Sequence, residues 1–102
     1  MMKTTINEAD GKAIAILEGE LDTTAAASVE QELQPLFNNE GRDIFIDCTQ
    51  LSYIASSGLR ILLSILKSAK AKGSRVVLQH VNDDIMNVFR MTGFNTLFEF
   101  ES

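Results

Sequence analysis

The sequence predicts an α/β domain built on a single, mixed but mostly parallel β-sheet with helices packed on it. Short β-branched and apolar segments alternate with segments whose apolar residues recur at helical spacing, in the order β-β-α-β-α-β-α-β. Strands that alternate with helices favour parallel pairing through right-handed crossovers. Gly, Asn and Asp punctuate the chain without any long linker, so we expect residues 1–102 to form one domain.

The first two predicted strands form a hairpin. Residues 4–9 and 13–17 are β-tolerant and are separated by Asp10-Gly11, a strong turn signal. The second segment is apolar throughout, which is typical of a strand covered on both faces. We expect residues 19–22 to end it, and Thr23 or Thr24 to cap the helix that follows. That helix should carry its apolar stripe through residues 36–37 and end within residues 38–41.

The remaining elements follow the same alternation. Residues 43–48 read as a compact strand, and a polar turn then leads into the clearest helix, whose apolar stripe starts at Leu59 and which ends before Gly73. Residues 75–79 read as the next strand. A helix capped by Asn82 or Asp83 should end at Gly93, and residues 96–100 should form the last strand.

Composition excludes several function classes. Nine Lys and Arg against fourteen Asp and Glu give a formal net charge of −5 at pH 7, with no basic cluster, which disfavours nucleic acid and anionic membranes. One Cys cannot form an internal disulfide, and one Cys with one His cannot build a zinc site, so no metal or cofactor is expected. No signal peptide or membrane-spanning run stands out, which predicts a cytoplasmic protein without membrane insertion.

The chemically informative segment is residues 51–60, which follows a central strand and opens the clearest helix. Open α/β folds place their sites at this carboxyl end of the sheet. Ser56 or Ser57 is expected at or just before the N-cap, where a Ser contributes about 1 kcal/mol. Two serines exceed what a cap requires, and a spare hydroxyl beside a helix N-terminus tolerates a phosphate well. On the residues alone, capping is favoured over regulation.

Three motifs in order along the chain carry a family resemblance: Gly19-Glu20-Leu21-Asp22, Ser56-Ser57-Gly58-Leu59 and Met91-Thr92-Gly93-Phe94. Together they resemble the STAS family over essentially the whole chain, and within it the stand-alone bacterial anti-sigma factor antagonists. The resemblance implies a protein switch and not an enzyme. In the family, the dephosphorylated antagonist binds an anti-sigma factor that is itself a serine kinase and thereby releases the sigma factor. The kinase uses ATP to phosphorylate the first Ser of the central motif.

By position, the resemblance makes Ser56 the expected phosphoacceptor and Ser57 the expected cap. Gly58 is expected to let the chain approach the partner closely. Asp22 has two interpretations that stay open: a family position near the phosphoacceptor, or a cap of the helix that starts at Thr23. The expected partner-contact surface consists of Asp22, Thr23, Ala55, Ser57, Gly58, Leu59 and Arg60.

One position departs from the family pattern. Many kinase-regulated members have Asp directly before the acceptor Ser, whereas this chain has Ala55, which can neither orient the hydroxyl nor remove its proton. The alternative function is therefore a constitutive STAS accessory subunit of a membrane lipid-transport ATPase, without phosphorylation control.

The other polar candidates have structural interpretations. Cys48 reads as a small buried hydrophobe, His80 as a surface or cap residue, and Asp43 and Asp47 as the solvated ends of one strand. The chain lacks a nucleophile elbow, a phosphate-binding Gly-rich loop and a defensible Ser/His/Asp arrangement, so no enzyme activity is expected. An apolar patch on the helix that contains Val88 and Met91 allows a weak homodimer.

Overall fold

The computed structural model describes residues 2–37 and 41–101 and contains a five-stranded sheet of order β1-β2-β3-β4-β5. The antiparallel hairpin consists of β1 (Lys3–Ala9) and β2 (Lys12–Leu21). Parallel pairing then joins β2 to β3 (Ile44–Ile54), β4 (Val76–Gln79) and β5 (Glu99–Glu101). The predicted α/β class and mostly parallel sheet are confirmed.

Helices connect the parallel strands. Between β2 and β3 lie α1 (Thr23–Glu32) and the single turn α2 (Gln34–Phe37), which contains Pro35. The longest helix is α3 (Ser56–Ala71), and α4 (Asp83–Thr92) with the short 3-10 turn η1 (Phe94–Thr96) leads to β5. The first predicted helix is therefore two helices, and its expected end at residues 38–40 lies outside the described part of the chain.

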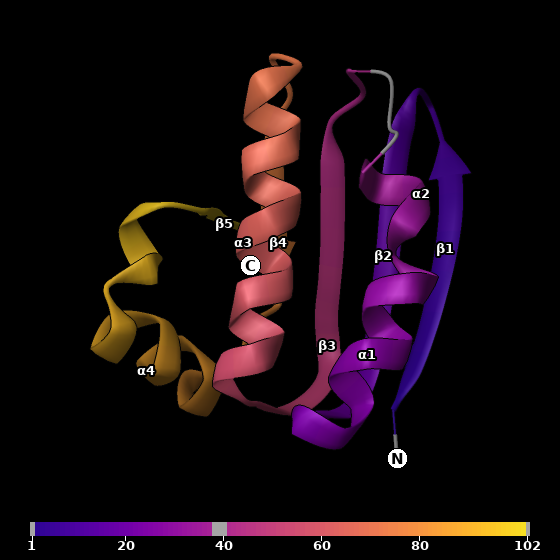
Figure 1. The fold of residues 1–102 in the computed structure, drawn as a ribbon. Helices are drawn as coiled ribbons and strands as arrows, with labels where there is room; N and C mark the ends of the chain where they lie inside the picture. Colours follow the sequence, from indigo (N-terminus) through magenta and orange to yellow (C-terminus); the bar gives the residue numbers. More distant parts are fainter. Residues whose placement is uncertain (1, 38–40, 102) are drawn as a thin grey trace.

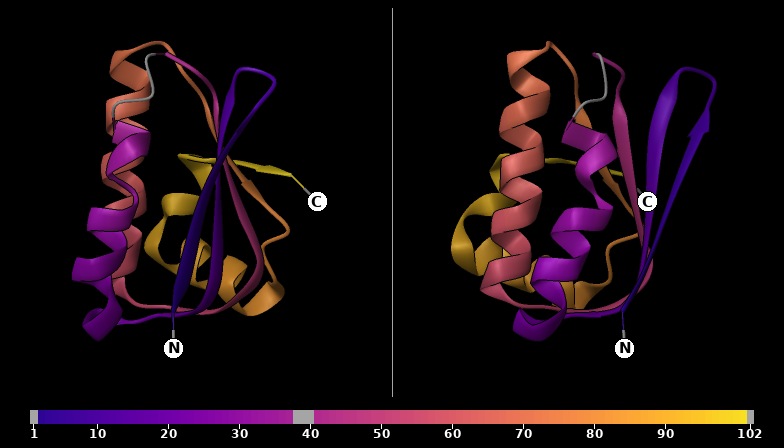
Figure 2. Two further views of the ribbon diagram at one scale, coloured as in Figure 1. Left: turned by 90° about the vertical axis from the view of Figure 1, so that its right-hand side faces the viewer. Right: turned by 45° about the vertical axis from the view of Figure 1, so that its right-hand side comes forward.

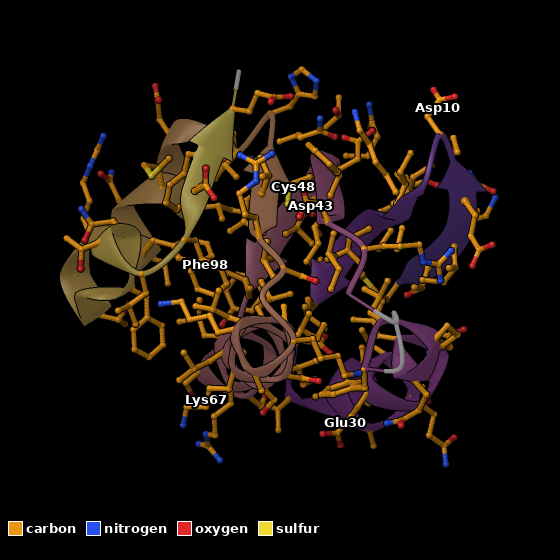
Figure 3. The ribbon with its side chains drawn as sticks, turned by 90° about the horizontal axis from the view of Figure 1, so that it is seen from above. Asp10, Glu30, Asp43, Cys48, Lys67 and Phe98 are labelled. Carbon is orange, nitrogen blue, oxygen red and sulfur yellow. The ribbon has the colours of Figure 1, made fainter. Side chains whose placement is uncertain are left out.

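Helices α1 and α3 lie side by side over one face of the sheet, and α4 lies at its β5 end (Figures 1 and 2). Seen from above, Glu30 of α1 and Lys67 of α3 lie on the helical side, whereas Asp10 lies at the tip of the hairpin (Figure 3). The buried core joins sheet and helices, and the Phe89 ring of α4 contacts the rings of Phe98 and Phe100 edge-on at 5.7 and 5.5 Å between centroids.

The interpretation of the second strand as covered on both faces is wrong. Ala13, Ala15 and Leu17 are fully buried, but Ile14 and Ile16 between them are only partly buried. Successive side chains of a strand point to opposite faces, so only one face of β2 faces the main core. An apolar run in the sequence does not distinguish this arrangement from a strand that is buried on both faces.

Three predicted boundaries also differ from the structure. Strand β2 continues through residues 19–21, and β3 continues to Ile54, where a polar turn was expected. Buried Leu21, Leu51 and Ile54 hold these extensions together across the β2–β3 pair, with register irregularities near Gly19. The last strand begins at Glu99 and not at residue 96, because residues 94–96 form the turn η1.

Within residues 2–37 and 41–101, none of the helices combines the length and apolar character that crossing a bilayer requires.

Candidate functional site

Two strand ends bring the predicted site residues together. Strands β2 and β3 are parallel, Leu21 is paired with Ile54, and the backbone N–H of Ala55 donates to the carbonyl of Leu21 at 2.9 Å. Asp22 and Ser56 therefore leave the sheet side by side, each at the start of a helix. The predicted juxtaposition of Asp22 with the serine motif follows from this parallel pairing.

The N-terminus of α3 has no side-chain cap. Its N-cap position is Ala55, with extended backbone at φ −90° and ψ 169°, and among the described residues no side chain makes a capping hydrogen bond there. By contrast, the Asp22 carboxylate caps α1 by accepting from Ala25 N–H at 2.8 Å, and Asn82 caps α4 by accepting from Ile85 N–H at 2.9 Å. The prediction that Ser57 caps α3 is wrong, because the N-cap is Ala55, two residues earlier, and both serines lie in the first turn of the helix. The cap interpretation of Asp22 is confirmed, whereas capping by Thr23 or Thr24 is not observed.

The two serines occupy different environments. Ser56 is the first helical residue and is exposed. The Ser57 hydroxyl oxygen is buried and has no hydrogen-bond partner in the described structure. Ser57 lines a groove of about 370 Å³ between α1 and α3. The side chains around this groove are those of Thr23, Ala26, Ala27, Glu30, Ser57, Arg60, Ile61 and Ser64.

Gly58 packs against the chain's own sheet. It is buried, and a Cβ atom there would lie 2.7 Å from Leu21 Cγ and 2.9 Å from Ile54 Cγ1. Its close approach is thus to β2 and β3, which corrects the expectation that the glycine makes room for a partner. The Leu59 side chain is also buried, at 2% exposure. The surface open to a partner therefore excludes Gly58 and the side chain of Leu59.

The remaining predicted contacts stay accessible. Thr23 and Arg60 are exposed, and Asp22 and Ala55 are half-buried. Sequence reasoning missed Tyr53, which is 51% exposed near the end of β3. Its signal was an aromatic residue next to Ser52, just before the serine motif. Exposed tyrosines are common anchors of protein interfaces because they bury a large rigid ring and retain a hydroxyl.

The other polar candidates are held in structural roles. The Asp43 carboxylate accepts from Arg75, and the Asp47 carboxylate accepts from Thr49. Asp43 directly precedes β3, but Asp47 lies within it, so the expectation that Asp47 marks the other end of the strand is wrong: β3 continues to Ile54. Burial works to raise the pKa of Asp47, but the two hydrogen bonds from Thr49 and the nearby His80 outweigh it and hold that pKa below its ordinary value.

Cys48 is buried and His80 lies at the surface, as the sequence predicts. Burial, with the charge of Asp47, raises the pKa of the Cys48 thiol to about 12, so the thiol stays protonated. His80 is an exposed turn residue at φ 57°. A second hollow, of about 380 Å³, is lined by Leu78, His80, Val81, Met86, Phe100 and Glu101. In the described ranges, no three His, Cys, Asp or Glu side chains are arranged to hold a metal ion.

The patch considered for a homodimer is only partly exposed. Met91 is 84% exposed, whereas Val88 is only partly buried and Phe89 is buried in the core. Homodimer formation stays a prediction.

Comparison with known proteins gives a consistent result. The STAS domain family model matches residues 3–102. An anti-sigma-B factor antagonist of Listeria monocytogenes is 32% identical over 98 residues, which cover 95% of this chain and 86% of the relative. A candidate anti-sigma factor antagonist from Thermotoga maritima has a similar fold, with a TM-score of 0.87 at 20% identity over 97% of this chain and 86% of that one. The phosphorylated form of the Bacillus cell-fate determinant SpoIIAA has a TM-score of 0.72 at 20% identity, over 98% and 92% of the two chains.

Proposed function

The chain belongs to the STAS domain family, and on that premise we propose that it is an anti-sigma factor antagonist. It binds an anti-sigma factor that is also a serine kinase, and this binding releases the sigma factor that the kinase holds. Phosphorylation of Ser56 by the same kinase, with ATP, ends the interaction. We expect the protein to act in the cytoplasm, to need no cofactor and to catalyse no reaction itself.

The exposed Ser56 hydroxyl at the start of α3 is the observation that carries this proposal. Ser56 lies beside Asp22. The next residue is Ser57, whose hydroxyl has no hydrogen-bond partner among the described residues. Ser56 is accessible to a kinase, whereas the Ser57 oxygen is buried. The burial difference supports the first serine, and not the second, as the acceptor.

Phosphorylation acts here by charge and bulk. It adds about −1.5 to −2 charges to a surface that already contains the Asp22 carboxylate. A partner surface that fits the neutral hydroxyl then meets a dianion that it has no group to neutralise. A loss of about 2.8 kcal/mol corresponds to a hundredfold loss in affinity.

The test combines phosphorylation with binding. The chain is incubated with ATP and each anti-sigma factor kinase of the same genome, and the product is analysed by intact mass and peptide mapping. We expect one phosphate on Ser56, none on the Ser56→Ala variant and continued phosphorylation of the matched Ser57→Ala variant. Binding to the same kinase should weaken about a hundredfold or more for Ser56→Asp and little for Ser57→Ala. A phosphate on Ser57, or unchanged binding of Ser56→Asp, would contradict the proposal.

Ala55 gives the experiment a second comparison. If the carboxylate that many family members have before the acceptor assists the transfer, Ala55→Asp should be phosphorylated faster than the natural chain. The rival function, a constitutive accessory subunit of a lipid-transport ATPase, predicts no phosphate on either protein and binding that is indifferent to Ser56.

A further inference from the structure

Arg60 lies one helical turn beyond Ser56 on the same face of α3. Residues four apart on a helix are neighbours, and a helical side chain leans toward the helix N-terminus, so the Arg60 stem points back toward Ser56. Both residues are exposed. The order also matters, because an anion four residues before a cation is the favourable arrangement in a helix.

The Arg60 guanidinium is exposed, and it is unpaired in the part of the chain that the structure describes. Within the described part of the chain it has neither an ion pair nor a hydrogen bond, in contrast to Arg75, which contacts Asp43 and Glu99. Arg60 shares the α1–α3 groove with Glu30, but no ion pair joins these two side chains. Among the described residues, an unpaired cation thus lies on the same face of α3 as the hydroxyl that we propose is phosphorylated.

We propose that Arg60 is the intramolecular counter-ion of a phosphate on Ser56. This inference rests on the proposed function and adds a residue that positions the modification. A guanidinium donates two parallel hydrogen bonds to a phosphate, so Arg60 orients the phosphoryl group as well as offsetting part of its charge. Arg60 thereby sets how much of the added charge a partner meets, in a chain where position 55 supplies no polar side chain.

The experiment measures the phosphate directly. Phosphoserine is placed at position 56 by genetic encoding, and its second pKa, ordinarily about 6, is followed by ³¹P NMR titration. A nearby cation favours the dianion and lowers this pKa. Replacing Arg60 should therefore raise it, by roughly 0.2–0.7 units for an exposed pair.

Matched variants isolate the role of Arg60. The carboxylates of Asp22, which caps α1, and of Glu30, which lines the groove with Arg60, stay constant across the series. The carboxylate of Glu20, on β2 opposite Tyr53, also stays constant. Arg60→Gln removes the charge beside the phosphate, whereas Lys67→Gln removes an equal charge on the same helix about two turns further along. We expect the upward shift for Arg60→Gln, no shift for Lys67→Gln and an intermediate pKa for Arg60→Lys, which retains charge without the planar fork.

Equal pKa values for the Arg60→Gln and Lys67→Gln phosphoproteins would overturn the inference, as would an Arg60→Lys value equal to that of Arg60→Gln. Arg60 is exposed, so these variants should fold, and ¹H–¹⁵N spectra of each one check this. The phosphate is installed during synthesis, so a failure of any kinase to modify Ser56 rejects the proposed function without altering this titration.

Discussion

Replacing Gly58 by Ala places two opposing effects at one position. The Gly58 backbone is one that any L-residue adopts, so a methyl group there should by itself favour the helix by about 0.5–1 kcal/mol. The same methyl group would lie 2.7 Å from Leu21 Cγ and 2.9 Å from Ile54 Cγ1. Leu21 is 0% and Ile54 is 3% exposed, so neither side chain can move into solvent.

Overpacking of this kind costs about 1–3 kcal/mol, so the clash should outweigh the helix preference. We expect Gly58→Ala to lower the free energy of unfolding by about 1–2 kcal/mol, measured by urea denaturation followed by circular dichroism. The control is Ser64→Ala, an exposed change on the same helix, which should stay within about 0.5 kcal/mol of the natural chain.

A double-mutant cycle tests the cause. Leu21→Ala opens space at the clash, so Gly58→Ala should cost less in that background than in the natural chain. A Gly58→Ala variant as stable as the natural protein, or a cost that does not depend on residue 21, would refute the packing argument.

Three further predictions concern the helix caps, Cys48 and Asp47. Ala55→Asp supplies the missing cap of α3 and should raise the free energy of unfolding by about 0.5–2 kcal/mol in urea titrations. Asp22→Ala and Asn82→Ala remove existing caps and should lower the free energy of unfolding by a similar amount. A destabilised Ala55→Asp variant would show that α3 does not accept a cap. The buried Cys48 thiol, with its pKa raised to about 12, should react with a disulfide reagent at pH 8 far more slowly in the native protein than in urea, and equal rates would contradict its burial. The pKa of Asp47 is lower in the folded chain than in the unfolded one, so the Asp47 carboxylate contributes fully to the free energy of unfolding above the unfolded value near 3.8 and loses this contribution as the pH falls through the folded value. The difference in the free energy of unfolding between the natural chain and Asp47→Asn should therefore shrink between pH 7 and pH 3, and a constant difference would contradict this prediction.

The sequence by itself was sufficient for the α/β alternation and the order of the strands and main helices, but not for the break between α1 and α2 or for the turn η1. Apolar residues of α3 and α4 recur at helical spacing because each helix buries one face, and this periodicity is a local property. The turn at Asp10-Gly11, the C′ glycine at Gly93 and the cap at Asn82, one of two candidates, were likewise predicted, because each depends on a few neighbouring residues. The serine motif was placed at the carboxyl end of a strand for the same reason.

Tertiary packing decided what local pattern cannot contain. Residues 49–54 form the second half of β3 because Leu51 and Ile54 are buried against β2, a pairing that joins distant parts of the chain. Because β3 is longer than predicted, α3 begins at Ser56 and its N-cap is Ala55, whose side chain has no hydrogen-bond acceptor. Gly58 then packs directly against Leu21. Ser56 is therefore exposed while the Ser57 oxygen is buried, a distinction between adjacent identical residues that depends on which atoms of other elements lie against them.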